Sequence, residues 1–266
     1  SSTGGPGSIV VLWNNGMIGN VWQGFTESSP ILVGGEPLDI EVGDFNGDGS
    51  ANDIVVANYN DDNVSILSND NNGIFTKTDV STDIGPKYIA IGEYVEDALE
   101  LDDIVVGCTS FKASVLTNAS SFRSRAISFT HTNSISIPSA GDIKPGDVNH
   151  DKDLDFIILD IASEEVRVLE GTGNGTTPPM FVVGNPLPNG SAPVQLSFSD
   201  VNRDGNDDAI TVNEGTGSLS ILLGDGNDLG NTSSFVIGAS PQSMAVHDFD
   251  NDGDDDFVVS LIGNGS

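Results

Sequence analysis

The feature that most constrains this chain is a short acidic segment that recurs along it. It reads "DFNGDG" from Asp44, "DVNHDKDLD" from Asp147, "DVNRDGNDD" from Asp200 and "DFDNDGDDD" from Asp248, with a weaker copy, "EYVEDALELDD", from Glu93. The five starts are 49, 54, 53 and 48 residues apart. A period of this length is too long for leucine-rich repeats and fits the four-stranded blade of a propeller.

Each acidic segment stands between two stretches that have the character of strands. Alternating apolar residues precede it, as at Leu38, Ile40 and Val42. A continuous apolar run follows it, as in "DIVVAN", "DDIVVG", "DFIILD", "DAITVN" and "DFVVSL", which is expected of a strand buried on both faces. A third apolar run and a less regular fourth complete the unit. The sequence therefore predicts an all-β chain built of antiparallel four-stranded units.

The two ends of the chain each hold half a repeat. The N-terminal "GSIVVLWNNG" matches a third strand, whereas the C-terminal "DFVVSLIGNGS" continues a second strand. We therefore expect one β-propeller domain over residues 1–266 with five four-stranded blades. In this interpretation N-terminal strands pair with C-terminal strands in one blade and close the ring, which removes two exposed sheet edges. Two alternatives stay open: a piece of a longer array, or halves that complete each other between neighbouring molecules.

The spacing of oxygen-bearing side chains in the loops predicts calcium. Counted from the first acid, they recur at positions 1, 3, 5 and 9, and position 7 can contribute a backbone carbonyl. This alternation points successive oxygens at one centre, as Ca²⁺ with its many oxygen ligands requires, whereas Mg²⁺ demands a tight octahedron and keeps several waters. The predicted ligands of about four calcium sites are Asp44, Asn46, Asp48 and Asp53; Asp147, Asn149, Asp151, Asp153 and Asp155; Asp200, Asn202, Asp204, Asn206 and Asp208; and Asp248, Asp250, Asp252, Asp254 and Asp256.

Two of the five loops depart from the pattern. The first has Asn52 at position 9 and Asp53 at position 10, so one residue must bulge if Asp53 is to coordinate. The second has Glu93, Val95 and Asp97 where Asp, Asn and Asp stand elsewhere, and we expect no calcium there. An EF-hand is excluded because Val, Thr and Val occupy position 12 of the first, fourth and fifth loops, where that motif requires Glu. Asp, Asn and Gly also make ordinary turns, but their recurrence in register favours calcium.

These loops resemble those of the FG-GAP/VCBS repeat family, which carry D-x-D/N-x-D-G-x-x-D between the first two strands of a propeller blade. The resemblance covers essentially the whole chain. It implies a calcium-bound β-propeller such as the integrin α-subunit head and certain fungal lectins, whose calcium loops are mainly structural and whose ligands bind through other loops or between blades. Those relatives usually have seven blades, whereas this sequence has about five repeats, so no ligand pocket carries over.

Composition narrows the partners and the location. With 40 acidic and 9 basic residues the net charge is −31, which excludes nucleic acid and adsorption to anionic membranes, since both need clustered Lys and Arg. No apolar run reaches the length of a membrane-spanning helix, and Cys108 as the one cysteine excludes a disulfide within the chain. Calcium loops favour the exterior of a cell. Six sequons would be surface glycan sites in a secreted eukaryotic protein, namely Asn63, Asn118, Asn174, Asn189, Asn231 and Asn264.

The sequence contains no motif that indicates catalysis. It lacks a Gly-x-Ser-x-Gly elbow, a phosphate loop and a Cys/His cluster, and its three histidines are dispersed. We therefore predict that the protein is not an enzyme. Five aromatic residues could stack on a sugar ring if exposed, although core packing is the simpler interpretation: Trp13, Trp22, Tyr59, Tyr88 and Tyr94.

These observations together predict a calcium-binding extracellular recognition or adhesion module. Its ligand would be a glycan or a protein, with no nucleic acid and no direct membrane insertion. One alternative is a structural subunit of an extracellular coat, stalk or filament that self-assembles through its split terminal blade. A carbohydrate-active enzyme, a glycosidase or lyase, is a further alternative, since two acids that face a sugar would suffice.

Overall fold

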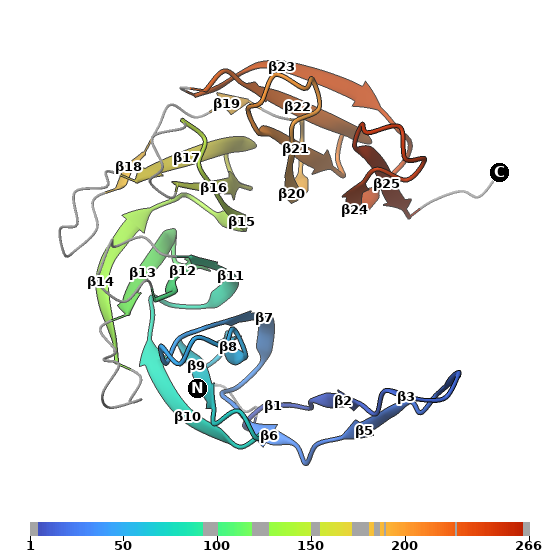
Figure 1. The fold of residues 1–266 in the computed structure, drawn as a ribbon. Coiled ribbons are helices and arrows are strands. Elements are labelled where there is room, and N and C mark those ends of the chain that lie inside the picture. Colours follow the sequence, from blue (N-terminus) through green and yellow to red (C-terminus); the bar gives the residue numbers. More distant parts are fainter. Residues whose placement is uncertain are drawn as a thin grey trace.

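The protein, described by a computed structural model, consists of β-strands along an open arc. The structure describes residues 5–92, 101–118, 128–149, 155–171, 181–183, 187–188, 190–226 and 228–262. Every regular element in these ranges is a strand, and every paired strand runs antiparallel to its neighbour. The sheets follow one another in chain order around the arc (Figure 1). None of the described residues lies in a helix that is long and apolar enough to span a membrane.

Four sheets have the predicted topology of a blade, with neighbouring strands in chain order. We name them blades 1 to 4. Blade 1 comprises β7 (Pro37–Gly43), β8 (Asp53–Asn58), β9 (Asn63–Asn69) and β10 (Phe75–Ser81); blade 2 comprises β11 (Pro86–Gly92), β12 (Asp103–Cys108), β13 (Lys112–Asn118) and β14 (Phe129–Ser136); blade 3 comprises β15 (Ala140–Gly146), β16 (Asp155–Asp160), β17 (Glu165–Gly171) and β18 (Phe181–Val183), with β19 (Leu187–Pro188) also on β17; blade 4 comprises β20 (Pro193–Ser199), β21 (Asp208–Asn213), β22 (Ser218–Gly224) and β23 (Leu229–Val236).

Two smaller units stand at the ends of the arc. The C-terminal half-blade consists of β24 (Pro241–His247) and β25 (Asp256–Leu261), which pair with each other. The N-terminal hairpin is a long ribbon in which three short strands pair with the three that return: β1 (Ser8–Ile9) with β6 (Ile31–Leu32), β2 (Leu12–Asn14) with β5 (Phe25–Glu27), and β3 (Met17–Ile18) with β4 (Val21–Trp22).

The predicted pairing between N-terminal and C-terminal strands does not occur among the described residues. Each end pairs with itself, and Figure 1 shows the half-blade and the hairpin on opposite sides of the opening of the arc. The physical reason is their packing, because the hairpin lies against blade 1 and the half-blade lies against blade 4. The all-β class and the four-stranded repeat unit are confirmed, whereas ring closure is not seen.

The core lies between successive blades. All six residues of β8, β12, β16 and β21 are buried, as their continuous apolar runs predict. One apolar cluster fills each junction from blade 1 to the C-terminal half-blade, and Phe156, which is fully buried, belongs to the cluster between blades 2 and 3. The arc is therefore one continuous stack of packed sheets.

Polar side chains on the first strands also join successive blades. The carboxylate of Asp39 in blade 1 accepts a hydrogen bond from the backbone N–H of Ile89 in blade 2 at 2.7 Å. Asp142 accepts one from the N–H of Leu196 at 3.0 Å, and Gln195 makes the same bond to the C-terminal half-blade. In each case the acceptor side chain stands five residues before the start of one acidic loop. The backbone N–H that donates to it stands four residues before the start of the next loop. Three of the four junctions thus share one contact geometry.

Candidate metal centres

The acidic loops join the first and second strands of each blade, and three of them are described in full. In the loop of the C-terminal half-blade, the carboxylate of Asp248 accepts hydrogen bonds from the amides of Asp252 (3.1 Å) and Gly253 (2.9 Å). The loops of blades 1 and 4 have the same two bonds at the same positions. The sequence pattern therefore corresponds to one turn geometry built three times.

Glycine at position 6 of the loop is required by this geometry. Gly49, Gly205 and Gly253 have φ angles of 83°, 90° and 91°. These values lie in the left-handed region, which residues with a side chain adopt only with strain. This explains why the "DG" step recurs in the loops of blades 1 and 4 and of the C-terminal half-blade.

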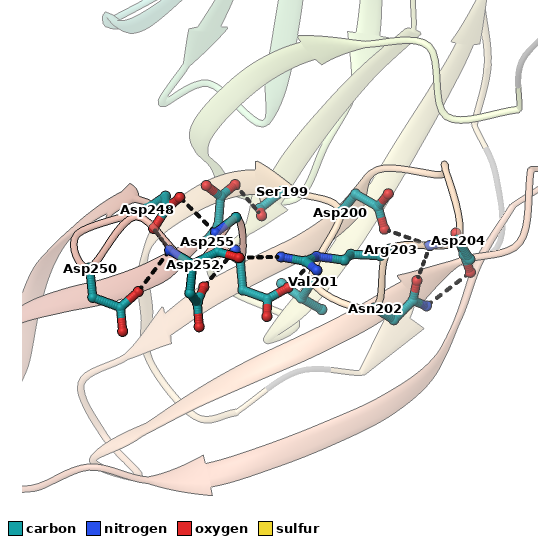
Figure 2. A network of polar contacts seen from close by, with 12 residues as sticks. Ser199, Asp200, Val201, Asn202, Arg203, Asp204, Asp248, Asp250, Asp252 and Asp255 are labelled. Carbon is teal, nitrogen blue, oxygen red and sulfur yellow. Dashed lines mark hydrogen bonds and ion pairs between the residues drawn. The ribbon is translucent and has the colours of Figure 1, made fainter.

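The C-terminal half-blade brings three predicted ligands together. One carboxylate oxygen from each of Asp248, Asp250 and Asp256 lies within 4.8 Å of the others. Ionised carboxylates at this separation repel one another, and a divalent cation between them would turn the repulsion into attraction. The donor set consists of oxygens only, with Asp252 beside it in Figure 2, so these residues fit Ca²⁺ by their chemistry.

The last aspartate of the blade 1 loop has a structural role that the sequence did not indicate. Asp53 is fully buried and accepts hydrogen bonds from the backbone amides of Phe45 (3.0 Å), Asn46 (3.0 Å) and Asn69 (2.7 Å), and from the side-chain amide of Asn46 (3.0 Å). Burial raises the pKa of this carboxyl, although the bonds from Asn69, Phe45 and Asn46 oppose the increase. Asp53 thus ties the loop to the end of β9.

The same bond across the loop recurs in the other repeats. The amide at loop position 2 donates to the last aspartate at 2.9 Å in blade 3, 3.0 Å in blade 4 and 3.1 Å in the C-terminal half-blade, where Asp155, Asp208 and Asp256 are the acceptors. Asp53, not Asn52, is therefore the last loop position of blade 1. Blade 2 keeps this aspartate as Asp103, which accepts the amide of Asn118 at 2.6 Å. The signal in the sequence is an aspartate at the first position of every second strand.

The remaining predicted ligands are placed as follows. Asn46 and Asn202 each accept the amide two residues further on with their side-chain oxygen, at 2.9 and 2.8 Å. Asp147 and Asn149 belong to the described part of the blade 3 loop, where Asp147 starts the loop after β15. The other residues of that loop, Asp151 and Asp153, lie outside the described residues, as do Glu93, Val95 and Asp97 of blade 2.

An arginine joins the loops of blade 4 and the C-terminal half-blade, a link that sequence reasoning missed. Figure 2 shows Arg203 reaching across, where it forms an ion pair with Asp254 and donates to the carbonyl oxygen of Asp252 at 3.4 Å. Ser199 adds a hydrogen bond to Asp255 at 2.7 Å. Arg203 offsets part of the negative charge between the loops, and its pairing with the Asp254 carboxylate leaves the carbonyl of that residue to serve as the predicted ligand.

Two expectations about surface residues are corrected. Asn118 is 7% exposed and its side-chain amide donates to the carbonyls of Phe45 (3.0 Å) and Asp102 (3.2 Å), so it is not a surface glycan site. Trp13 and Trp22 are 39% and 53% exposed, so core packing is the wrong interpretation for both.

The other candidate sugar-binding aromatics and sequon asparagines whose side chains the structure describes are partly buried. Tyr59 and Tyr88 are partly buried, and Asn63 is partly buried and accepts a hydrogen bond from Asn58 at 2.7 Å. Tyr94, Asn174, Asn189 and Asn264 lie outside the described residues, as does the side chain of Asn231.

The stacked antiparallel sheets and their repeated loops define a repeat protein of the β-propeller type. Within that class the chain carries FG-GAP-like repeats, since residues 147–211 and 200–259 match the FG-GAP-like repeat family. Two solved structures of BBS1N in complex with ARL6DN are similar in fold. The mercury-soaked one has a TM-score of 0.57 and 12% identity over 90% of this chain and 65% of that chain. The lead-soaked one has a TM-score of 0.58 and 11% identity over 90% and 66%.

At such identities the likeness shows the fold alone, and this chain spans less than two thirds of the length of those chains. A comparison with curated proteins found no match.

Proposed function

We propose that this protein is a calcium-binding recognition module of the cell exterior, which binds a protein or a glycan without catalysing a reaction. The observation that carries the proposal is the convergence of Asp248, Asp250 and Asp256 to within 4.8 Å, in a loop whose hydrogen bonds repeat in blades 1 and 4. The FG-GAP-like repeats support it, and the similar solved structures contain a protein partner.

Calcium in this proposal is structural. The ions would be held by the carboxylate and amide oxygens of positions 1, 3 and 5, with the last aspartate shared between the metal and the backbone. Four divalent ions would offset eight of the 31 net negative charges, and most of that relief would fall in loops where the carboxylates are close together. The ligand would then bind elsewhere on a surface whose loops the ions hold in place.

The calcium content of the purified chain tests the metal part of the proposal. We expect about four ions per chain by elemental analysis after dialysis against calcium, and a melting temperature that falls by many degrees in chelator. Asp250→Ala, which removes the position-3 oxygen, should remove one ion, whereas Glu27→Gln, an exposed acid of the N-terminal hairpin, should remove none. A chain that holds no calcium and melts alike with and without chelator would contradict the assignment.

The N-terminal hairpin carries an exposed pair of aromatic rings that could bind a glycan. The rings of Trp22 and Phe25 pack edge to face with centroids 5.2 Å apart, and the indole N–H of Trp22 donates to Asn14 at 2.9 Å. A rigid exposed ring beside amide groups is suited to stacking on a sugar. A glycan array should show binding that Trp22→Ala abolishes. Binding to an extracellular protein that Trp22→Ala leaves intact would instead favour the protein ligand.

A second candidate function is a subunit of an extracellular assembly, and the open arc favours it. Four complete blades and two terminal halves give material for five blades. We propose that the two halves complete one four-stranded blade, within one chain by closing the ring or between chains. A sedimentation measurement that finds a concentration-independent monomer would reject assembly and support closure within the chain.

A further inference from the structure

One face of blade 1 is exposed where every later unit is covered. Ile40, four residues before the acidic loop, is 49% exposed, whereas the residues at the same position in the later units, Ile89, Ile143, Leu196 and Met244, are 3%, 1%, 0% and 7% exposed. Each of those four packs on the preceding blade. Blade 1 therefore presents the receiving half of the blade junction to solvent.

The C-terminal half-blade presents the other half of the same junction. Val258, two residues after the last loop aspartate, is 56% exposed, whereas Val55, Val105, Ile157 and Ile210 at the same position are all 0% exposed. Each of these packs on the blade that follows, as Val55 does in the cluster that contains Ile89. The exposed faces at the two ends of the arc thus carry the same pair of apolar positions that pack together at each of the four junctions between them.

The N-terminal hairpin already fills the outer part of the missing junction. Ile9 and Val11 pack on Ile54, Val56 and Leu67 of blade 1. In the same way, the third strand of blade 1 packs on blade 2. The hairpin therefore lies where the third and fourth strands of a blade before blade 1 would lie. No described residue occupies the places of the first and second strands of that blade.

A groove marks the place of those inner strands. It has a volume of about 230 Å³ and is lined mainly by apolar side chains, including Ile9, Leu38, Ile40 and Val56. Leu38 and Val42 on its strand are 45% and 51% exposed. An exposed apolar surface beside an unpaired strand edge is the arrangement that a further β-strand recognises.

We propose that the C-terminal half-blade of one copy enters this groove on a second copy, so that β25 pairs with β1 and β2 and completes a four-stranded blade. Val258 would then cover Ile40, and the side chain of Ser243, at the position of Asp39 in blade 1, would face the amide of Ile40. This inference deepens the second candidate function and rests on it. A head-to-tail contact of this kind generates an open chain of copies or a larger ring.

A second copy fits the groove better than the half-blade of the same chain. The two ends are held apart by apolar clusters that run without interruption through blades 1 to 4 and onto the C-terminal half-blade. Closed contact within one chain would change the packing at several of these junctions together, and packed interiors do not deform continuously. Contact between copies needs no such change.

Sedimentation of the 266-residue chain in calcium and physiological salt tests the proposal. We expect assembly over a hundredfold range of concentration, stronger at high concentration. Ile40→Lys spoils the receiving end and Val258→Lys spoils the inserting end, so each variant alone should be monomeric. An equal mixture should form dimers, because the intact inserting end of Ile40→Lys can enter the intact receiving end of Val258→Lys. Assembly should stop there, because both free ends of that dimer carry a lysine. Val236→Lys, at an 86% exposed position of β23, should assemble as the unchanged chain does.

Three results would overturn the proposal. These are a monomeric unchanged chain, assembly that survives both lysine variants, and a mixture of the two variants that stays monomeric. Circular dichroism and calcium content, measured on every sample, show that each variant is folded. Loss of assembly with normal calcium content would leave the recognition module in place, whereas assembly without calcium would reject only the metal assignment.

Discussion

Replacing Asp53 with alanine should destabilise the protein by a mechanism that does not depend on calcium. The Asp53 carboxylate accepts three backbone amides and one side-chain amide, and Phe45, Asn46 and Asn69, which donate them, are at most 8% exposed. Each buried donor left without an acceptor costs about 1–3 kcal/mol. Three backbone amides give about 3–9 kcal/mol, and we expect about 4 kcal/mol because water can enter the vacated space. That is a large part of the about 5–15 kcal/mol by which native domains are stable.

Urea unfolding with calcium and with excess chelator separates the two roles of this loop. With an m-value of about 3 kcal/mol/M, the midpoint for Asp53→Ala should fall by about 1.3 M in chelator and by more in calcium, where the carboxylate also holds the metal. Asp48→Ala is the matched control in the same loop, because Asp48 is only partly buried and its effect should shrink once calcium is removed. The reasoning is refuted if the cost of Asp53→Ala disappears in chelator, since the carboxylate would then act through the metal alone.

Three further predictions follow from the buried side chains. Arg167→Gln should lower the free energy of unfolding by about 3 kcal/mol, because the guanidinium pairs at 2.8 Å with the fully buried Asp160. Burial opposes ionisation of Asp160, but hydrogen bonds from Ser163 and Arg167 outweigh the effect of burial and lower the pKa of this carboxyl. The stabilisation by ionised Asp160 is therefore present above the unfolded pKa of about 3.9 and is lost as pH falls through the lower folded pKa. Urea midpoints measured from neutral pH downward should show a smaller loss of stability in acid for Arg167→Gln than for the unchanged chain. Phe156→Ala should cost about 3–5 kcal/mol in the same assay, and a loss below 1 kcal/mol would contradict the core assignment. The Cys108 thiol, whose pKa burial raises to about 11, should react with a thiol reagent only after unfolding, and rapid native labelling would contradict its placement.

The blades were predictable because their strands are determined by local patterns. The "DIVVAN" run predicts a strand buried on both faces, and all six residues of β8 are buried. The alternating residues before each loop predict a strand with two different faces, and β7 has such an alternation of half-buried and exposed residues. Period and spacing were sufficient since each blade is closed by contacts within about fifty residues.

The ends were not predictable in this way. Strand pattern shows that a residue such as Val258 needs a covered face, but the same pattern occurs whether the cover comes from the same chain or from another molecule. Trp13 and Trp22 were expected in the core for the same reason, since their apolar surface says nothing about the available neighbour. Burial at the first and last units depends on which sheet lies next to them, and the sequence of one unit does not contain that information.

The metal ligands and the scaffold of each loop can be distinguished by comparing blade 2 with the others. Its sequence lacks the oxygen at position 3, yet Asp103 binds the amide of Asn118 and β12 is as buried as β8. A blade thus folds with the last aspartate in place and without the full ligand set. Calcium would then order the outer part of a loop on a blade that is already formed. Chelation should therefore loosen the loops while the junction faces of Ile40 and Val258 persist, so that ligand binding depends on calcium more strongly than assembly does.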